Sequence, residues 1–458
     1  MDLIYGIKDK PKFGKVVLFA LQQLLAIMAA TIAVPAIING NCGCELTASA
    51  ALFGAGVGSI VYLLFTKSSS PVFLGSSFAF IGSMSTAFAG AASMAAGYWG
   101  LIIGAVMAGL VYVIISIIVK AFGVEWINKL MPPVIIGPTV AIIGLSLAGN
   151  AVGDAMKSNV APVVLADGAH TAAYYIAIIC AIVTLGVTML FATYGKKMGK
   201  LIPFILGILA GYLCASVFAL IGKISGNSNL IVINYSALTS LDWSKFSSYF
   251  SFPKFTFMLG GTDGLKGISG TYLLTLFTAY VPVAFVVFAE HIADHKNLST
   301  IVGKDLLKEP GLNRTLLGDG IGSMAGALFG GCPNTTYGES IGCVAITRNA
   351  SVVSIWGCAF CCLILSMITP IVAFLETIPS CVMGGVCIAL YGFIAVSGLK
   401  MFQSVDLNKN RNLFVASVIL ITGVGGFSIS FGKVTITTVA CALILGILTN
   451  VILSKEDA

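Results

Sequence analysis

The sequence predicts an all-α membrane protein that crosses the bilayer many times. Its 458 residues are 58% hydrophobic and only 9% charged, and a mean hydropathy of +1.01 leaves too little polar surface to enclose a water-soluble core. Apolar runs of about 20 residues, the length that crosses a ~30 Å hydrocarbon core, recur along the whole chain. We therefore expect a polytopic membrane protein with about fourteen transmembrane segments.

The expected spans follow the apolar runs, several of which Gly and Pro interrupt. The first run comes after Lys8, Lys10, Lys12 and Lys15 and lacks a small-residue cleavage site, so it is interpreted as a retained helix rather than a signal peptide. The predicted spans begin near residues 14, 49, 71, 97, 131, 171, 199, 271, 311, 334, 350, 377, 412 and 432.

The basic residues predict the orientation of these spans. With the N-terminus in the cytoplasm, about three-quarters of the Lys and Arg residues fall on the inner side, as the positive-inside rule expects. An even number of spans also returns the C-terminus to the cytoplasm. We therefore expect both termini on the cytoplasmic side of a cell membrane. The net charge of +7 does not indicate a nucleic-acid partner, because the basic residues form no stripe with interleaved aromatic side chains.

A short internal repeat predicts that the chain is built from two related halves. Pro132 followed by Gly137 in the fifth span recurs as Pro379 followed by Gly384 in the twelfth. Spans five and twelve are seven apart, and an odd number of spans per half would invert the second half, as in many secondary transporters. The expected division is a first inverted repeat at 1–225, an outer loop at 226–270 and a second repeat at 271–458. Within the outer loop, the aromatic segment 242–257 is expected to rest at the membrane interface.

The third and tenth spans are interrupted rather than smooth apolar helices. The third carries Gly-Ser-Ser-Phe-Ala-Phe at 75–80, and the tenth carries Asn-Thr-Thr-Tyr-Gly-Glu at 334–339. Broken segments at corresponding positions of two halves indicate a midplane binding site, because only backbone that lines a polar cavity can leave its N–H and C=O groups unpaired. For segment 75–80, close helix packing is an equally good explanation.

Glu290 and Glu339 lie in stretches that are otherwise nearly free of charge. A carboxylate in hydrocarbon costs several kcal/mol unless it faces a partner, a ligand or water, so both residues are candidate functional groups. Asp294 follows Glu290 by one helical turn and is expected on the same face. Burial and a second acid nearby both favour a neutral carboxyl group, so one member of this set is a candidate proton carrier.

The two histidines beside these acids are open to different interpretations. Asp294 and His295 could instead lie at the cytoplasmic end of the span, solvated among lysines; this is the preferred interpretation for His295, and it is left open for Asp294. His291 points about 100° away from Glu290 around a helix, and packing is as well supported there as a functional role.

The alternatives from other classes are an intramembrane enzyme and a channel. The chain has three His residues and no His-Glu-x-x-His pattern, so no catalytic constellation is found. A channel would require repeated filter sequences or rings of like charge along a pore. Two acids in separate segments fit a single occluding site better, so we expect a carrier.

The twelve cysteines do not predict a metal site. Cys42 and Cys44 are expected in an outer loop, where they either form a strained disulfide or stay reduced. Cys358, Cys361 and Cys362 lie among apolar residues in mid-helix, where cysteine behaves as a small hydrophobic residue.

Three segments resemble the nucleobase-ascorbate transporter family, also called nucleobase:cation symporter-2, and most closely its bacterial uracil permeases. They are residues 73–80, residues 289–291 and residues 333–348, and the resemblance extends over essentially the whole chain. The last segment includes the family signature, which here begins at Glu339 and retains Gly342, Thr347 and Arg348.

The resemblance implies a fourteen-helix fold of two inverted repeats, with short antiparallel strands in the third and tenth spans. Spans 1–4 and 8–11 would form a core domain, spans 5–7 and 12–14 a gate domain, and two chains a homodimer. By the family pattern, the substrate-binding residues would be Glu290, Glu339, Phe78, Gly338, Tyr337 and Ser77.

Three positions depart from the family pattern. Gln23 stands where the family commonly has a His, Ser340 stands where the signature has an Asn, and Asp294 stands where uracil permeases often have a His. Gln23 cannot carry a proton, Ser340 has a shorter reach, and Asp294 keeps a titratable group of opposite charge. We regard Gln23 and Ser340, with the retained signature residues, as tuning positions.

Taken with the resemblance, the residues predict a secondary transporter that imports uracil by proton symport. Glu290, Asp294 and Glu339 are the candidate proton-coupling groups, and neither a catalytic residue, a metal nor a cofactor is expected. A Glu at position 339 favours a pyrimidine, since the xanthine and urate carriers of the family tend to have Gln there. The alternatives are xanthine or another purine as substrate and sodium as coupling ion.

Overall fold

The protein is mostly helical in the computed structural model, which describes residues 3–165, 168–196, 198–431 and 434–454. The helices of the first half are α1 (Phe13–Cys42), α2 (Ala48–Phe65), α3 (Ile81–Ala89), α4 (Met94–Phe122), α5 (Glu125–Leu130), α6 (Pro133–Ser146), α7 (Ala148–Ala155), α8 (Ala172–Tyr194), α9 (Met198–Leu201), α10 (Pro203–Ser225), α11 (Ser236–Thr239) and α12 (Thr256–Lys266). Those of the second half are α13 (Gly270–Val302), α14 (Leu312–Gly330), α15 (Gly338–Thr347), α16 (Val352–Leu365), α17 (Thr369–Glu376), α18 (Ser380–Lys400), α19 (Asn410–Val424) and α20 (Thr438–Ile452).

The predicted spans coincide with these elements. A helix or strand begins within a few residues of each predicted start, except that the start near residue 432 lies outside the described residues and α20 begins at Thr438. Among the described residues, eight helical stretches are long and apolar enough to cross a membrane, and four shorter helices are apolar as well. The multi-pass membrane architecture is therefore confirmed, whereas the count of fourteen spans and the inverted repeat stay predictions.

Two of the predicted spans are interrupted by short strands, as expected. Strand β1 (Leu74–Ser76) pairs antiparallel with β2 (Asn334–Thr336), and Gly75 lies opposite Thr335. A helix follows each strand closely. After β1, the turn η1 (Phe78–Phe80) leads into α3, and after β2, helix α15 begins at Gly338. The pairing satisfies backbone groups that hydrocarbon could not, and it brings two helix N-termini to one place. A second antiparallel pair, β3 (Ile429–Phe431) with β4 (Val434–Ile436), lies between α19 and α20.

Helix α2 packs closely on α14 because glycines line the contact. A side chain at Gly54 would overlap the carbonyl oxygen of Gly326, and one at Gly58 would overlap the amide of Asn334. The Asn334 amide donates to the Gly54 carbonyl at 3.1 Å. Since Asn334 begins β2, this contact fixes the strand against the two helices.

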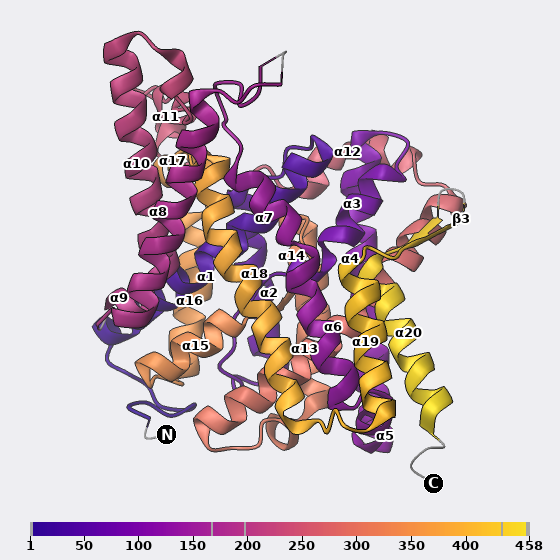
Figure 1. Ribbon diagram of the computed structural model, residues 1–458. Helices are drawn as coiled ribbons and strands as arrows, with labels where there is room; N and C mark the ends of the chain where they lie inside the picture. The colour runs from indigo at the N-terminus through magenta and orange to yellow at the C-terminus, as the bar shows by residue number, and fades with distance from the viewer. Residues whose placement is uncertain (1–2, 166–167, 197, 432–433, 455–458) are drawn as a thin grey trace.

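The helices form two groups by their contacts (Figure 1). In one group, α2 and α4 pack on α14, α1 packs on α16, and α13 packs on α4. In the other, α18 packs on α6, α7 and α8, α10 packs on α8, and α19 packs on α6 and α20. The first group contains the predicted core spans and the second the predicted gate spans. Whether the groups move as core and gate stays a prediction.

Both ends of the chain lie at the lower end of the molecule in Figure 1. The N-terminal segment pairs there with the residues that follow α15. The Ile4 amide donates to the Arg348 carbonyl at 2.8 Å, and the Ala350 amide donates to the Tyr5 carbonyl at 2.9 Å. The N-terminal segment therefore anchors the end of α15 that lies away from Glu339.

The cysteines form no disulfide, and most aromatic side chains of the outer segment are exposed. All twelve cysteines are free, so Cys42 and Cys44 form no disulfide, and Cys358 and Cys362 are buried in α16. In the described part of the chain, no group of His, Cys, Asp and Glu side chains is arranged to hold a metal ion. In segment 242–257, the side chains of Trp243, Phe246, Tyr249, Phe250 and Phe252 are exposed, and their place at a membrane interface stays a prediction.

Candidate functional site

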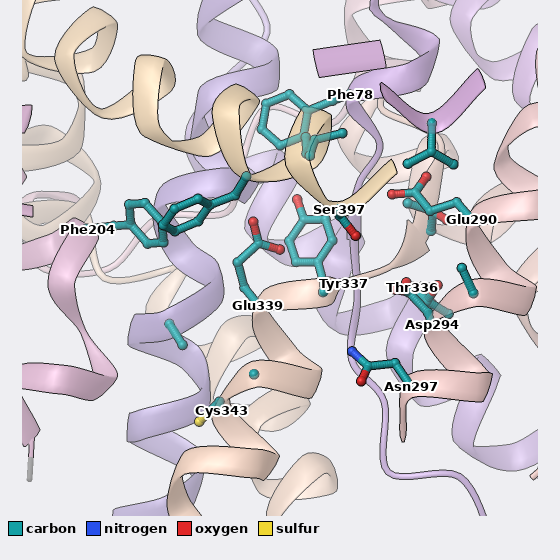
Figure 2. Close-up of a pocket in the computed structure, with 18 of the residues that line it drawn as sticks. Phe78, Phe204, Glu290, Asp294, Asn297, Thr336, Tyr337, Glu339, Cys343 and Ser397 are labelled. Carbon is teal, nitrogen blue, oxygen red and sulfur yellow. Dashed lines mark hydrogen bonds between the residues drawn. The ribbon is translucent and has the colours of Figure 1, made fainter. Parts of the chain in front are cut away.

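A cavity of about 450 Å³ lies between the two groups of helices and contains the predicted acids (Figure 2). From the first group it is lined by residues of α13, of β2 and of α15, namely Glu290, Asp294, Asn297, Thr335, Thr336, Tyr337, Gly338, Glu339 and Gly342, with Phe78 after β1. From the second group it is lined by Lys200, Phe204, Phe393, Ser397 and Met401, among others. Strands β1 and β2 thus lie beside a polar cavity, as the interrupted spans predicted.

Three carboxyl groups face this cavity from two helices. Glu290 and Asp294 lie one turn apart on α13, and Glu339 lies in the first turn of α15. In the view of Figure 2, Tyr337 lies between Glu339 on the left and Glu290 with Asp294 on the right. The Thr336 hydroxyl donates to Asp294 at 2.7 Å and links this acid to β2. Carboxyl groups from two helices that line one cavity can bind a small ligand that presents N–H donors and C=O acceptors along its edges.

Tyr337 and Phe78 form the end of the cavity nearest the strands. The Tyr337 hydroxyl donates to the Ser76 carbonyl at 2.8 Å, and its ring occupies the space that a side chain at Gly75 would fill. The Phe78 ring meets the Tyr391 ring of α18 edge-on, with 5.4 Å between the ring centroids. Phe78 also lines a second cavity of about 310 Å³ on its far side, so this side chain lies between two hollows.

The two tuning positions Gln23 and Ser340 contact each other. The Gln23 amide donates to both the hydroxyl and the carbonyl of Ser340, the latter at 3.2 Å, and the Ser340 hydroxyl accepts from the Phe73 amide at 3.1 Å. Both side chains are buried and neither lines the cavity. They join α1 to the start of α15 and to the residue before β1, so they support the site indirectly.

This contact predicts that the two departures from the family pattern act together. We expect Gln23→His or Ser340→Asn alone to weaken substrate binding, since either change leaves a buried polar group with a mismatched partner. The double variant should recover part of the loss, with a coupling energy of about 0.5–3 kcal/mol. Binding to the purified parent, the two single variants and the double variant measures this coupling. Additive losses would show that the two positions act independently.

The other predicted residues lie at different distances from the cavity. Gly342 lines it, one turn along α15 from Gly338. Thr347 and Arg348 end the helix instead: the Thr347 hydroxyl donates to the Cys343 carbonyl at 2.6 Å, and Arg348 adopts a left-handed conformation. Ser77 is buried outside the cavity lining, and its hydroxyl has no hydrogen-bond partner among the described residues.

The expectation of a solvated His295 is wrong. Its side chain is fully buried, and Nε2 lies 2.8 Å from the Tyr62 hydroxyl of α2. The following lysines suggested a helix end, but α13 continues to Val302 and the segment after α2 covers His295. Asp294 lines the cavity, so the alternative that placed it in the solvated helix end does not apply. His291 is buried on a different side of α13.

Sequence reasoning missed several lining residues. Asn297 lies one turn beyond Asp294 on α13, and the same helical spacing that linked Glu290 to Asp294 would have found it. Phe204 and Ser397 come from α10 and α18, and only the contact between the two helix groups brings them to the cavity.

Comparisons with known proteins identify the family of this chain. Residues 14–431 match the model of a family described as "Permease family". The uracil permease of Bacillus caldolyticus is 38% identical over 98% of this chain and 94% of its own length. The uracil permeases of Bacillus subtilis and Escherichia coli K12 are 38% and 34% identical over 99% and 96% of this chain, and over 96% and 92% of their own lengths.

Solved structures support the same architecture. The transmembrane domain of the cyanobacterial bicarbonate transporter BicA aligns with a TM-score of 0.60 at 14% identity, covering 97% of this chain and 100% of that one. Murine Slc26a9, an anion transporter in the inward-facing state, aligns with a TM-score of 0.65 at 12% identity, covering 98% and 69%. The match to the permease family and the full-length relatives named as permeases thus define a membrane transporter rather than an enzyme. The chain belongs to the permease family, and the resemblance to the nucleobase:cation symporter-2 proteins is confirmed.

Proposed function

We propose that this protein imports uracil by proton symport. The observation that carries the proposal is the cavity that Glu290 and Asp294 of α13 line together with Glu339 of α15 beside the paired strands. Full-length relatives named as uracil permeases support the choice of substrate. Uracil is planar, and its ring N–H groups alternate with carbonyl oxygens, which suits several carboxyl groups that line one small cavity.

The acids would couple the substrate to the proton through their protonation. An ionised carboxylate accepts a hydrogen bond from a ring N–H, and a protonated carboxyl group can also donate to a ring carbonyl. Amides at Phe78 and Gly338, beside the two helix N-termini, would complete the contacts. If uracil binds best when one acid is protonated, then the proton also binds best when uracil is present, because linkage is reciprocal.

Transport would proceed by alternating access. The cavity reaches from Phe78 to Lys200 and Met401, near the chain segments assigned to the cytoplasm by the positive-inside rule. The Phe78–Tyr391 contact would close the opposite side in this state. The core group would carry the acids, the gate group would carry Tyr391 and Ser397, and both termini would be cytoplasmic. A homodimer in the cell membrane would hold the gate groups in place.

The second candidate is a purine carrier, with xanthine as substrate. A cavity of about 450 Å³ is large enough for either ring system, so its size does not exclude the larger base. Sodium in place of the proton is the corresponding alternative for the coupling ion.

The test is uptake of radiolabelled uracil into proteoliposomes that contain the purified protein. Uptake driven by an inward proton gradient, abolished by a protonophore and indifferent to sodium, supports the proposal. Strong competition by unlabelled xanthine indicates a purine carrier, and uptake that requires sodium indicates the other coupling ion. No saturable uptake of either base contradicts both substrate assignments.

Asp294 provides a sharper test of the coupling step. We expect Asp294→Asn to keep uracil binding within about threefold, because an amide oxygen still accepts the Thr336 hydrogen bond. Accumulation against a gradient should fall by at least about tenfold, since Asn cannot carry a proton, while exchange of internal for external uracil persists. Counterflow and gradient-driven uptake measured on the same vesicles separate the two processes. Equal losses in both would assign Asp294 to substrate binding instead.

A further inference from the structure

A histidine of α13 and an aspartate of α14 form a buried pair outside the cavity. His291 Nδ1 lies 2.6 Å from Asp319 Oδ2, and the two side chains are 0% and 2% exposed. Neither residue lines the cavity. His291 follows Glu290 directly, so the pair lies on a different side of α13 from the acids that face the cavity.

Hydrogen-bond geometry assigns the protons of this pair. The Thr315 hydroxyl donates to the Leu312 carbonyl at 3.1 Å, so at 3.0 Å it is available to accept a hydrogen bond from His291 Nε2–H. With Nε2 protonated, the short contact between Nδ1 and Asp319 must contain one further proton, because two lone pairs at this distance would repel. Whether that proton sits nearer the ring or the carboxyl group, the pair carries no net charge.

The surroundings disfavour the other assignment. If Thr315 donated to Nε2, Nδ1–H would donate to an ionised Asp319 and leave a buried net charge, which costs several kcal/mol. The groups that face the pair are Tyr112 of α4, whose ring lies 6.3 Å from that of His291, and His295, whose ring lies 4.1 Å away. Among the described residues, no Lys or Arg forms an ion pair with Asp319.

His295, which stacks on His291, connects this part of α13 to α2. His295 Nδ1 lies 2.8 Å from the His291 carbonyl oxygen, which can only accept, so this nitrogen carries a proton. His295 Nε2 contacts the Tyr62 hydroxyl of α2 at 2.8 Å. The two stacked imidazoles thus join α13 to α14 on one side and to α2 on the other. These contacts restrict the rotation of α13 about its axis, which determines where Glu290 and Asp294 point.

We propose that His291 and Asp319 are positioning residues: a net-neutral pair that shares one proton and orients α13 so that Glu290 and Asp294 face the cavity. The pair acts through α13 and exchanges no proton with the substrate. Measuring its effect through uracil binding and uptake rests on the proposed function.

The test compares Asp319→Ala with Asp319→Asn in the full-length protein. Asn can donate its amide N–H to His291 Nδ1 and keeps the pair neutral, whereas Ala leaves a buried imidazole nitrogen without a partner. We expect Asp319→Asn to bind uracil within about threefold of the parent and Asp319→Ala to bind it at least about tenfold more weakly. The pH profile of uptake by Asp319→Asn should match that of the parent. Asp263→Ala, at an exposed Asp of α12, is the matched control.

Three results would overturn the proposal. A loss of uracil affinity in Asp319→Asn as large as that in Asp319→Ala would show that the ionised carboxylate is required. A shifted pH profile in Asp319→Asn would show that the pair titrates during transport, and full affinity in Asp319→Ala would show that positioning does not depend on it. If Asp319→Ala does not fold, Asp319→Asn decides alone. If the parent binds no uracil, the proposed function fails, and the thermal unfolding of the variants still tests the pair.

Discussion

Glu290→Gln and Glu339→Gln are each expected to reduce gradient-driven uracil uptake by roughly two orders of magnitude. Hydrogen bonds to a charged group are stronger than neutral ones, and Gln at either position can never present an ionised acceptor to the substrate. Gln also cannot take up a proton, so uptake loses its coupling as well as its affinity. Initial rates of uptake under an inward proton gradient, with binding measured separately, give the two contributions.

The matched control for both variants is Glu125→Gln. Glu125 is an exposed glutamate at the start of α5 and does not line the cavity, so its substitution removes the same charge without touching the site. Uptake by this variant should equal that of the parent. Parent-like uptake by Glu290→Gln or Glu339→Gln would remove that glutamate from the site.

Gly54→Ala is expected to destabilise the protein by about 1–3 kcal/mol, the usual cost of overpacking a close contact. The added methyl group would overlap the Gly326 carbonyl oxygen and force α2 away from α14. The same movement would disturb Asn334, which donates to the Gly54 carbonyl, and with it strand β2. Uracil affinity should therefore fall together with the unfolding temperature.

Gly186→Ala in α8 is the matched substitution at a glycine with open space around it. Ala favours a helix over Gly by up to about 1 kcal/mol, so this variant should unfold at the same or a slightly higher temperature. Thermal unfolding of both variants in one detergent makes the comparison direct. Equal unfolding temperatures for Gly54→Ala and the parent would show that the contact between α2 and α14 relaxes without cost.

The sequence predicted those features that depend on local pattern. Apolar run length placed the helices, because hydrocarbon thickness sets the length of a span. The interruptions at 75–80 and 334–339 indicated the paired strands, and isolated charges indicated Glu290 and Glu339. Each of these signals lies within one short segment of the chain.

Features that depend on contacts between distant segments were not predicted. Asp319 was not singled out, because one Asp in a glycine-rich helix gives no sign that a histidine of α13 lies against it. Ser397 and Phe204 likewise reach the cavity only through the packing of the two helix groups. His295 was misplaced for the opposite reason, since the lysines near it in sequence outweighed the burial that α2 provides.

The pairing of β1 with β2 also has a consequence for biosynthesis. The two strands are separated by about 260 residues, so β1 is complete long before β2 exists. At synthesis rates of roughly 5–20 residues per second, this delay lasts about 13–50 s. During that time, the N–H and C=O groups of β1 lack the partners that they have in the mature protein, and hydrocarbon offers none. The binding site is therefore assembled late, after the ribosome has delivered the tenth predicted span to the membrane.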